Sequence, residues 1–245
     1  GFTVTGVGSF DEAKWQKAWN EKGENQSHEH IGDFGVPGIA VTAVNCKVTH
    51  NIVHHIGDTG IAIRGEKGRR CSPLVTENIC YRNMGGGIGS MNGSAAVITD
   101  NHCFENFYAG IGHNNASPIV RGNICHGNVR AGIGISEGEE ASPIIRGNRC
   151  ERNKLAGIGV RSNSAAYILE NHCHENGAAG IGISTAAAVI VRNQIENNKT
   201  AGIGISGKSK ASVIQNTSLA HRLVAIGTPT GGPALLHGPT LGPPA

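Results

Sequence analysis

The sequence of 245 residues is poor in aromatic and charged side chains. Aromatic residues make up 4% of the chain and charged residues 16%, against a usual charged share of ~25%. The net charge of +3 gives no electrostatic support for a nucleic-acid partner. No apolar run reaches the ~18 residues that a membrane span needs. The composition therefore argues against a conventional globular core, a nucleic-acid-binding domain and a membrane span.

What the sequence has in excess is glycine, and the glycines belong to a repeat. The 37 glycines are about twice the usual ~7% share. One phrase recurs every 22–27 residues: Asn-x-Cys-x-x-Asn, then two or three residues, then Ala-Gly-Ile-Gly. Its first asparagine falls at Asn51, Asn78, Asn101, Asn123, Asn148, Asn171, Asn193 and Asn216. The first glycine falls at Gly38, Gly60, Gly87, Gly110, Gly132, Gly157, Gly180 and Gly202. Two columns with one spacing identify an array of repeats.

The length and the inner pattern of the repeat predict short strands. Helical repeats need ~33 or more residues, and the Leu-x-x-Leu-x-Leu pattern of leucine-rich repeats is absent. Counted from each first asparagine, apolar residues recur at alternate positions, as inward-facing strand residues do. Three residues before it stand Val75, Ile98, Val120, Ile145, Ile168, Ile190 and Val213. We expect the asparagines at the corners of a coil, in the left-handed conformation that they tolerate and hydrogen-bonded into ladders.

Most cysteines occupy one column of this repeat. Two residues after the asparagine stand Cys80, Cys103, Cys125, Cys150 and Cys173. The usual zinc spacing Cys-x-x-Cys is missing, and Val53 and Ile195 fill the same column in other coils. The five are therefore predicted to be buried, unpaired thiols. Cys46 is expected in the core and Cys71, in a turn, at the surface. Unpaired thiols fit a cytoplasmic protein or a secreted one that shields them.

This pattern resembles the right-handed parallel β-helix of pectate lyases and related carbohydrate-active proteins, over about residues 38–227. The resemblance implies an all-β solenoid of about eight to nine coils. It also implies a groove along one sheet, where arginine or lysine neutralises uronate carboxylates and a base removes a proton. The Arg-x-Pro-x-x-Arg signature of pectate lyases and the Tyr-Gly-Phe-Asp-Pro-His signature of alginate epimerases are absent. No specific member is indicated.

The repeat also sets the domain boundaries. Residues 1–227 are expected to form the parallel β-helix domain, which an insertion over about residues 8–35 interrupts. Residues 228–245 hold five of the nine prolines and cannot continue the coil well. We expect this proline- and glycine-rich tail to pack on the body of the molecule or on a neighbouring chain, because it also carries leucines that a solvated linker lacks.

The insertion is predicted to contain a short helix over about residues 10–21. Ser9 and Glu12 fit a capping box at its start. Trp15 and Trp19 lie on one helical face, so this face should be buried. The helix either covers the end of the solenoid core or forms a wall beside the groove. An exposed tryptophan there would favour sugar binding, and a buried one would serve packing.

Two short segments concentrate histidine and carboxylate residues. Residues 28–33 and 54–58 precede equivalent strands of consecutive coils, so they should be neighbours in space. Such groups suit general acid–base chemistry, and equally a zinc or copper site or a polar loop patch. The candidate catalytic residues are His30, His54, Asp58 and Arg64. The candidate ligands of a divalent metal ion are His28, His30, Asp33, His54 and His55.

The strand with the Gly-Ile-Gly phrase is expected to show both glycines outward as a flat, bare surface. Glycine weakens a strand, so close approach of a ligand is a reasonable inference. Candidates for binding an acidic polysaccharide there are Tyr108, Arg130, Arg161 and Trp15. The outward histidines of single coils are interpreted as solvated; they are His102, His126, His172 and His174.

A second outward column is apolar and consists of Leu74, Val97, Ile119, Ile144, Tyr167 and Val189. Such a stripe suggests coverage by the tail or a homo-oligomer.

Three functions stay open. The chain is a carbohydrate-active protein of lyase or epimerase type acting on or binding an acidic polysaccharide, a non-catalytic structural or adhesive module that oligomerises, or a metal-binding β-helix protein. The first reading implies an extracellular or periplasmic location.

Overall fold

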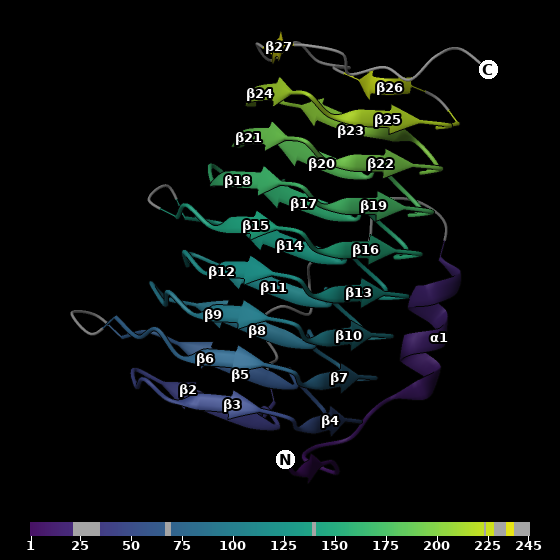
Figure 1. Cartoon of the computed structure of the whole chain (residues 1–245). Coiled ribbons are helices and arrows are strands. Elements are labelled where there is room, and N and C mark those ends of the chain that lie inside the picture. The colour runs from purple at the N-terminus through teal and green to yellow at the C-terminus, as the bar shows by residue number, and fades with distance from the viewer. Residues whose placement is uncertain (22–34, 67–69, 139–140, 223, 228–233, 238–245) are drawn as a thin grey trace.

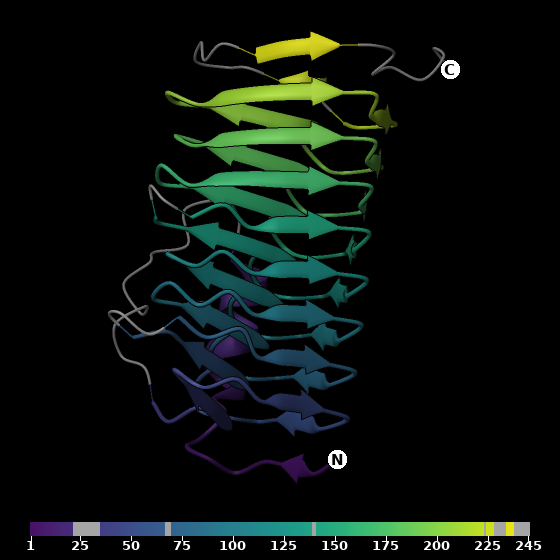
Figure 2. The same ribbon diagram turned by 60° about the vertical axis from the view of Figure 1, so that its left-hand side comes forward.

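The structure is a computed structural model that describes residues 1–21, 35–66, 70–138, 141–222, 224–227 and 234–237. The chain winds into stacked coils, and each coil adds one short strand to each of three parallel sheets (Figure 1). Figure 2 shows the strands as successive rungs from β1 at one end to β27 at the other. Nine strands in each sheet confirm the predicted all-β solenoid of eight to nine coils.

The three sheets are named A, B and C in the order in which the chain visits them. Sheet A contains β1 (Thr3–Val4), β4 (Ile52–His54), β7 (Ile79–Tyr81), β10 (His102–Phe104), β13 (Ile124–His126), β16 (Arg149–Glu151), β19 (His172–His174), β22 (Gln194–Glu196) and β25 (Thr217–Leu219). Sheet B contains β2 (Ile39–Thr42), β5 (Ile61–Arg64), β8 (Ile88–Met91), β11 (Ile111–Asn114), β14 (Ile133–Ser136), β17 (Ile158–Arg161), β20 (Ile181–Ser184), β23 (Ala201–Ser206) and β26 (Val224–Gly227). Sheet C contains β3 (Lys47–Thr49), β6 (Leu74–Thr76), β9 (Val97–Thr99), β12 (Ile119–Arg121), β15 (Ile144–Arg146), β18 (Ala165–Leu169), β21 (Ala187–Val191), β24 (Lys210–Ile214) and β27 (Ala234–His237).

The core consists of columns of like residues, because the parallel strands pair in register. Cys103 pairs with Cys80 on one side and with Cys125 on the other. The five stacked thiols are fully buried and free, as predicted. Burial, with sulfur hydrogen bonds to its two neighbours, raises the pKa of the Cys103 thiol well above its usual value. The pKa values of Cys150 and Cys173 are raised as well, so these three thiols are neutral packing material.

The other two cysteines are placed opposite to the prediction. Cys46, expected in the core, is exposed. Cys71, expected at the surface, is buried, and its thiol donates a hydrogen bond to the carbonyl oxygen of Arg64 at 3.5 Å. Both cysteines lie where the early coils depart from the regular repeat. Counting from the asparagine column therefore does not predict whether their side chains point into the core or outward.

Two asparagine ladders hold the coils together at the corners. In the first, the side-chain amide of Asn78 donates to Oδ1 of Asn101 at 3.0 Å and to the carbonyl oxygen of Thr76 at 3.0 Å. In the second, the amide of Asn106 donates to Oδ1 of Asn128 at 3.0 Å. The ladder asparagines of both series are buried. Each amide thus satisfies backbone groups that the turn leaves without a strand partner.

Two expectations about the corner residues are wrong in detail. The left-handed conformation belongs to the residue before the ladder asparagine, for example Glu77 with φ 57° before Asn78. The first glycine of each Gly-Ile-Gly phrase does not face outward. A Cβ at Gly132 would lie 2.8 Å from Nδ2 of Asn153, whereas one at Gly134 would only touch the methyl group of Ala109 at 3.4 Å. Only the second glycine leaves the surface bare.

The predicted helix is α1 (Glu12–Asn20), and it is capped differently from the prediction. Its N-cap is Asp11, whose Oδ1 accepts the backbone N–H of Lys14 at 2.9 Å, so the capping box at Ser9 is wrong. An aspartate at this position satisfies a free N–H and complements the positive end of the helix dipole.

Helix α1 runs along the outside of the stack, beside sheet A (Figure 1). The indole N–H of Trp15 donates to the carbonyl oxygen of Glu105 at 2.8 Å, and the side chain is buried against Phe107 and Val129. At the other end, Lys154 donates to the last carbonyl groups of the helix. Of the two predicted roles, the helix is a wall on the side of the solenoid.

The described part of the tail continues the solenoid. Strand β27 pairs in parallel with β24, in the register Ala211 with Ala234. The boundary expected at residue 227 therefore does not end the coil, and residues 228–233 and 238–245 lie outside the described residues. No helix in the described part of the chain is long and apolar enough to cross a membrane.

Candidate functional site

Asp58, one of the predicted site residues, has a buried carboxylate. It lies at the corner between β4 and β5 and is only 3% exposed. Its Oδ1 accepts a hydrogen bond from the hydroxyl group of Thr59 at 3.2 Å. Burial raises the pKa of Asp58, although the hydrogen bonds from Thr59 and the charge of Arg64 act in the opposite direction. A carboxylate with a raised pKa is a stronger base once it is ionised.

Tyr108 and Arg130 follow Asp58 along the same corner of the stack. The guanidinium of Arg130 lies 4.9 Å from the ring centroid of Tyr108. Burial raises the pKa of Tyr108, and the charge of Asp58 adds to this rise. The phenol oxygen is buried and has no hydrogen-bond partner among the described residues. A buried hydroxyl without a partner is rare in folded proteins and calls for an explanation, such as a catalytic role or a bound water.

Two further arginines lie within electrostatic reach of this corner. Burial lowers the pKa of Arg130, and the charge of Arg161 lowers it further. Arg64 at the end of β5 acts on Asp58. We call Asp58, Arg64, Tyr108, Arg130 and Arg161 the corner cluster; all five are residues that the sequence singled out.

The corner cluster borders the bare face of sheet B. The second glycine of each phrase lies there with its Cα outward, and a Cβ at Gly112 would meet nothing within 4 Å. Tyr108 also packs against the cluster of Trp15, Phe107 and Val129 that anchors α1. The surface is thus flat along sheet B and has the helix beside the corner cluster as its wall.

Two predicted site residues lie elsewhere. His54 is on sheet A, where its ring stacks on Tyr81 with centroids 4.9 Å apart, so it does not join Asp58. Trp15 is buried and stacks on Trp19 at 5.4 Å, and the guanidinium of Arg82 lies 5.7 Å from its ring. It anchors the helix and offers no ring face to a sugar, so its assignment to substrate binding is wrong.

The predicted metal site is described only in part. His28, His30 and Asp33 lie outside the described residues. Nδ1 of His54 and Nδ1 of His55 lie 2.8 Å apart. Among the described residues, no group of three or more histidine, cysteine, aspartate or glutamate side chains is arranged to hold a metal ion.

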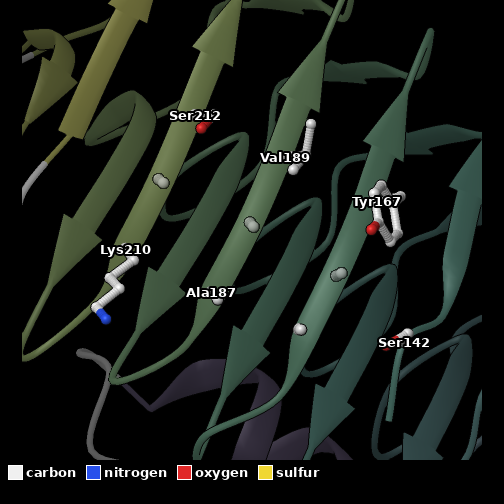
Figure 3. Close-up of a pocket in the computed structure, with 10 residues that line it drawn as sticks. Ser142, Tyr167, Ala187, Val189, Lys210 and Ser212 are labelled. Carbon is white, nitrogen blue, oxygen red and sulfur yellow. The ribbon is translucent and has the colours of Figure 1, made fainter. Parts of the chain in front are cut away.

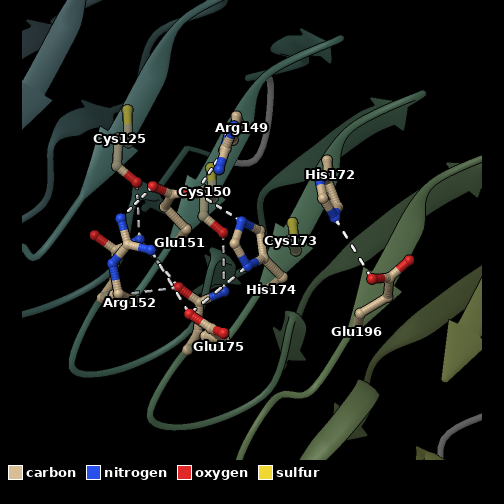
Figure 4. A network of polar contacts seen from close by, with 12 residues as sticks. Cys125, Arg149, Cys150, Glu151, Arg152, His172, Cys173, His174, Glu175 and Glu196 are labelled. Carbon is tan, nitrogen blue, oxygen red and sulfur yellow. Dashed lines mark hydrogen bonds and ion pairs between the residues drawn. The ribbon is translucent and has the colours of Figure 1, made fainter. Parts of the chain in front are cut away.

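Sequence reasoning missed a charged network on sheet A, centred on Glu151 (Figure 4). Arg149 and Arg152 both donate to its carboxylate, and Nε2 of His174 lies 2.6 Å from Oε2. Burial would raise the pKa of Glu151, but the hydrogen bonds from Arg149 and His174 and the nearby arginine charges outweigh it and lower the pKa. The signal was available, because Glu151 and His174 occupy one column of adjacent coils.

On the same sheet, in the coils nearer the N-terminus, aromatic and imidazole rings stack on one another. His54, Tyr81, Phe104 and His126 stack with centroids 4.9, 4.9 and 5.1 Å apart. Each ring lies over the next along the axis of the solenoid, so the flat faces are covered and only the edges face solvent. His126 and His102, interpreted from the sequence as solvated, are half-buried, and burial lowers the pKa of both.

Sheet C carries a shallow depression of 390 Å³ on its outer side (Figure 3). It is lined mainly by alanine side chains, with Tyr167, Val189, Lys210 and Ser212 around them. No acid, base or nucleophile pair converges there among these lining residues. The chemistry-bearing groups of the described chain are on sheet A and at the corner cluster.

Comparison with protein families identifies the architecture. Residues 30–143 and 134–218 match the right-handed β-helix region. The chain belongs to the right-handed β-helix family. This confirms the predicted family and handedness, and the β-helix proteins of this family share the coil without sharing one activity. A comparison with curated proteins finds no significant match.

Solved structures with the same fold act on polysaccharides. A variant of the periplasmic alginate epimerase AlgG matches with a TM-score of 0.74 at 13% identity, over 83% of this chain and 55% of that one. The A-module of the mannuronan C-5 epimerase AlgE4 from Azotobacter vinelandii matches with a TM-score of 0.63 at 16% identity, over 82% and 65%. The catalytic unit of an α-1,3-glucanase from Streptomyces thermodiastaticus matches with a TM-score of 0.55 at 12% identity, over 84% and 49%. The chain spans less than two thirds of each, and these identities show the fold alone.

Proposed function

We propose that this β-helix binds an acidic polysaccharide along the bare face of sheet B and abstracts a proton from it, as a lyase or an epimerase. The observation that carries the proposal is the corner cluster. Asp58, Tyr108 and Arg130 are withdrawn from water at one corner, and burial is the main cause of a displaced pKa in all three. Displaced pKa values in adjacent groups are typical of acid–base sites.

Each group has a role that follows from its environment. Arg64, whose charge acts on Asp58, would pair with the uronate carboxylate and stabilise the negative charge that develops on it. Arg130, three coils further along the same corner, would pair with the carboxylate of another sugar unit of the polymer. Asp58 would take the proton from the carbon next to that carboxylate. The Tyr108 hydroxyl would then give a proton, either to the departing glycosidic oxygen in a lyase or to the opposite face of the same carbon in an epimerase.

The similar structures support the substrate class without fixing it. Two of them are named for alginate and mannuronan, which are acidic polysaccharides, and one is named as periplasmic. A polysaccharide substrate would place this protein in the periplasm or outside the cell. The glucanase shows that the same coil also serves a glucan, so the arginines of the corner cluster are the reason for preferring an acidic chain.

The test is incubation with polymannuronate, polyguluronate and polygalacturonate. Calorimetry measures binding, ultraviolet absorbance detects the unsaturated ends that elimination creates, and proton NMR detects inverted residues. We expect D58N and Y108F to bind the polymer and to lose turnover by about 10²–10⁴-fold, since each removes a proton-transfer group. R130M should weaken binding itself.

The matched control is R121M, which removes an exposed arginine on sheet C. It should leave binding and turnover unchanged. Binding without any product would favour the non-catalytic module, and equal loss of binding in R121M and R130M would reject the site on sheet B.

A second candidate, the oligomerising module, is favoured by the apolar column on sheet C. Ile119, Ile144 and Tyr167 pair in register and form one continuous apolar strip. Their side chains are nevertheless 42%, 37% and 46% exposed, respectively. Exposed apolar strips of this kind mark association surfaces. The two proposals are compatible, because the strip and the corner cluster lie on different sheets.

A further inference from the structure

Two histidines on the outer face of sheet A direct ring nitrogen atoms at each other and form a hydrogen bond. Nε2 of His102 on β10 and Nε2 of His126 on β13 lie 2.8 Å apart. Both rings are held by one aromatic neighbour: the ring of His126 stacks on Phe104 at 5.1 Å, and the ring of His102 packs on Phe104 at 4.8 Å. The pair is therefore positioned by packing before any ligand arrives.

The distance between the two nitrogens fits one coordination geometry better than another. With metal–nitrogen bonds of ~2.0 Å, two adjacent ligands at a right angle are ~2.8 Å apart, whereas a tetrahedral angle separates them by ~3.3 Å. Right angles between nitrogen ligands are the preference of Cu²⁺ and Ni²⁺, and tetrahedral angles are that of Zn²⁺. Without metal the two nitrogens share one hydrogen bond, so metal binding releases the shared proton to solvent and turns both lone pairs toward the ion.

We propose that His102 and His126 form a binding site for a divalent transition-metal ion with right-angled ligands, Cu²⁺ in the first place. The site is separate from the corner cluster and from the residues that the sequence suggested as metal ligands. It does not depend on the proposed activity, because its two ligands come from sheet A.

The surroundings define the site as an open one. Glu151 pairs in register with His126 one coil further on, but its carboxylate is held by Arg149, Arg152 and His174. It is therefore not available as a third ligand, and water completes the coordination. An open site with two imidazoles binds Cu²⁺ more tightly than Zn²⁺, in the order that the Irving–Williams series gives.

The experiment is a calorimetric titration of the full chain with Cu²⁺, Ni²⁺ and Zn²⁺. Because His54 and His55 also bring nitrogens to 2.8 Å, the titration is made in the H54Q/H55Q background. We expect one Cu²⁺ site with two nitrogen ligands in the electron paramagnetic resonance spectrum. H102Q and H126Q should each weaken Cu²⁺ binding by at least about tenfold, since even indirect disturbance of a ligand costs that much.

The matched control is H172Q, since His172 lies in the same outward column as His102 and its Nε2 lies 4.0 Å from the carboxylate of Glu196. H172Q should bind Cu²⁺ as the background does. Binding that survives both H102Q and H126Q, or Zn²⁺ binding tighter than Cu²⁺, would overturn the proposal. A second measurement uses the unmodified chain and therefore does not depend on whether a variant folds. Bound Cu²⁺ should protect His102 and His126 from modification by diethyl pyrocarbonate. If both histidines are modified as fast with Cu²⁺ as without it, the proposal is also overturned.

Discussion

At the corners between sheets A and B, the side chain of a ladder asparagine packs against a glycine of the preceding coil, where a Cβ atom would leave it no room. The Cβ that Gly132 lacks would lie 2.8 Å from Nδ2 of Asn153 and 2.8 Å from the carbonyl oxygen of Gly157. The asparagine occupies this space because its amide is fixed by the ladder. Both columns are visible in the sequence, but their dependence on each other appears only when the coils are stacked.

The substitution G132A should therefore destabilise the protein by about 1–3 kcal/mol, because overpacking displaces backbone and a hydrogen-bonded amide together. The matched substitution is G112A, where a Cβ has open space. It should leave stability unchanged or raise it by about 0.4–1 kcal/mol. Urea unfolding of the two variants compares the sites directly, and an equal effect of both would contradict this account of the glycine column.

Among the histidine side chains that the structure describes, His113 is the one that the strand pattern places in the core. It pairs in register with Ile135 and Ser90, is 3% exposed, and neither ring nitrogen has a hydrogen-bond partner in the described part of the chain. Burial lowers the pKa of His113 from 6.5 to about 3. The unfolded chain thus binds a proton near pH 6.5 and the folded chain does not, so the titration of His113 costs no stability above pH 6.5 and lowers the free energy of unfolding progressively as pH falls from 6.5 toward 3.

We expect H113I to stabilise the protein at neutral pH by about 1–3 kcal/mol, because it removes an unsatisfied buried polar group. The gain should grow between pH 6.5 and pH 3, since the variant no longer has to exclude a proton. Denaturant unfolding at several pH values measures this. A stability difference that stays constant across this range would show that His113 does not titrate as described.

At the scale of elements, the strands were predictable and the helix contacts were not. Parallel coils stack in register, so a column in the sequence becomes a ladder in space. Helix α1 interrupts the repeat, and its place depends on tertiary contacts such as the hydrogen bond from Trp15 to Glu105. The same reason explains β27: the prolines near it predicted a tail that packs on the body or on a neighbour without continuing the coil, but β27 pairs with the edge of β24.

Helix α1 should depend on Trp15 for its docking. W15A removes a buried indole and its hydrogen bond, which costs about 3–5 kcal/mol, and a nine-residue helix is not stable on its own. We expect protease cleavage within the helix while the melting temperature of the coils changes little. The control is K17A, whose side chain is exposed on the same helix. Cooperative loss of the whole fold in W15A would show that the helix is part of the core.

At the scale of the molecule, the sequence predicts which side chains follow one another along a corner better than which side chains meet across a turn. Tyr108 and Arg130 could be expected to be neighbours because they share a column of the repeat, and they are in contact. His54 and Asp58 are close in the sequence, yet His54 is on β4 of sheet A and Asp58 lies at the following corner, so the two side chains do not meet. Glu151 was missed because a single charge in a column looks solvated until its partners on the neighbouring strand are known.

The apolar strip of sheet C is the largest feature that a single chain leaves unexplained. The repeat builds it, because register places Ile119, Ile144 and Tyr167 in one line. No described element lies across it, since β27 extends the sheet at its end. A flat strip that repeats along the axis is complementary to a second copy of itself, and burying its side chains is favourable by ~25 cal/mol per Å².

We therefore expect the protein to self-associate through sheet C and I144K to shift it toward the monomer, because a lysine amine in the interface must be desolvated. The matched control is I79K, since Ile79 is an apolar side chain on sheet A with the same 37% exposure. Sedimentation equilibrium over a range of concentrations measures the change. Neither variant should alter the melting temperature of the isolated monomer, because both side chains lie on the outer surface. A monomeric wild type, or an equal shift toward the monomer in both variants, would show that the strip does not mediate self-association. The strip would then have to be covered by a different molecule.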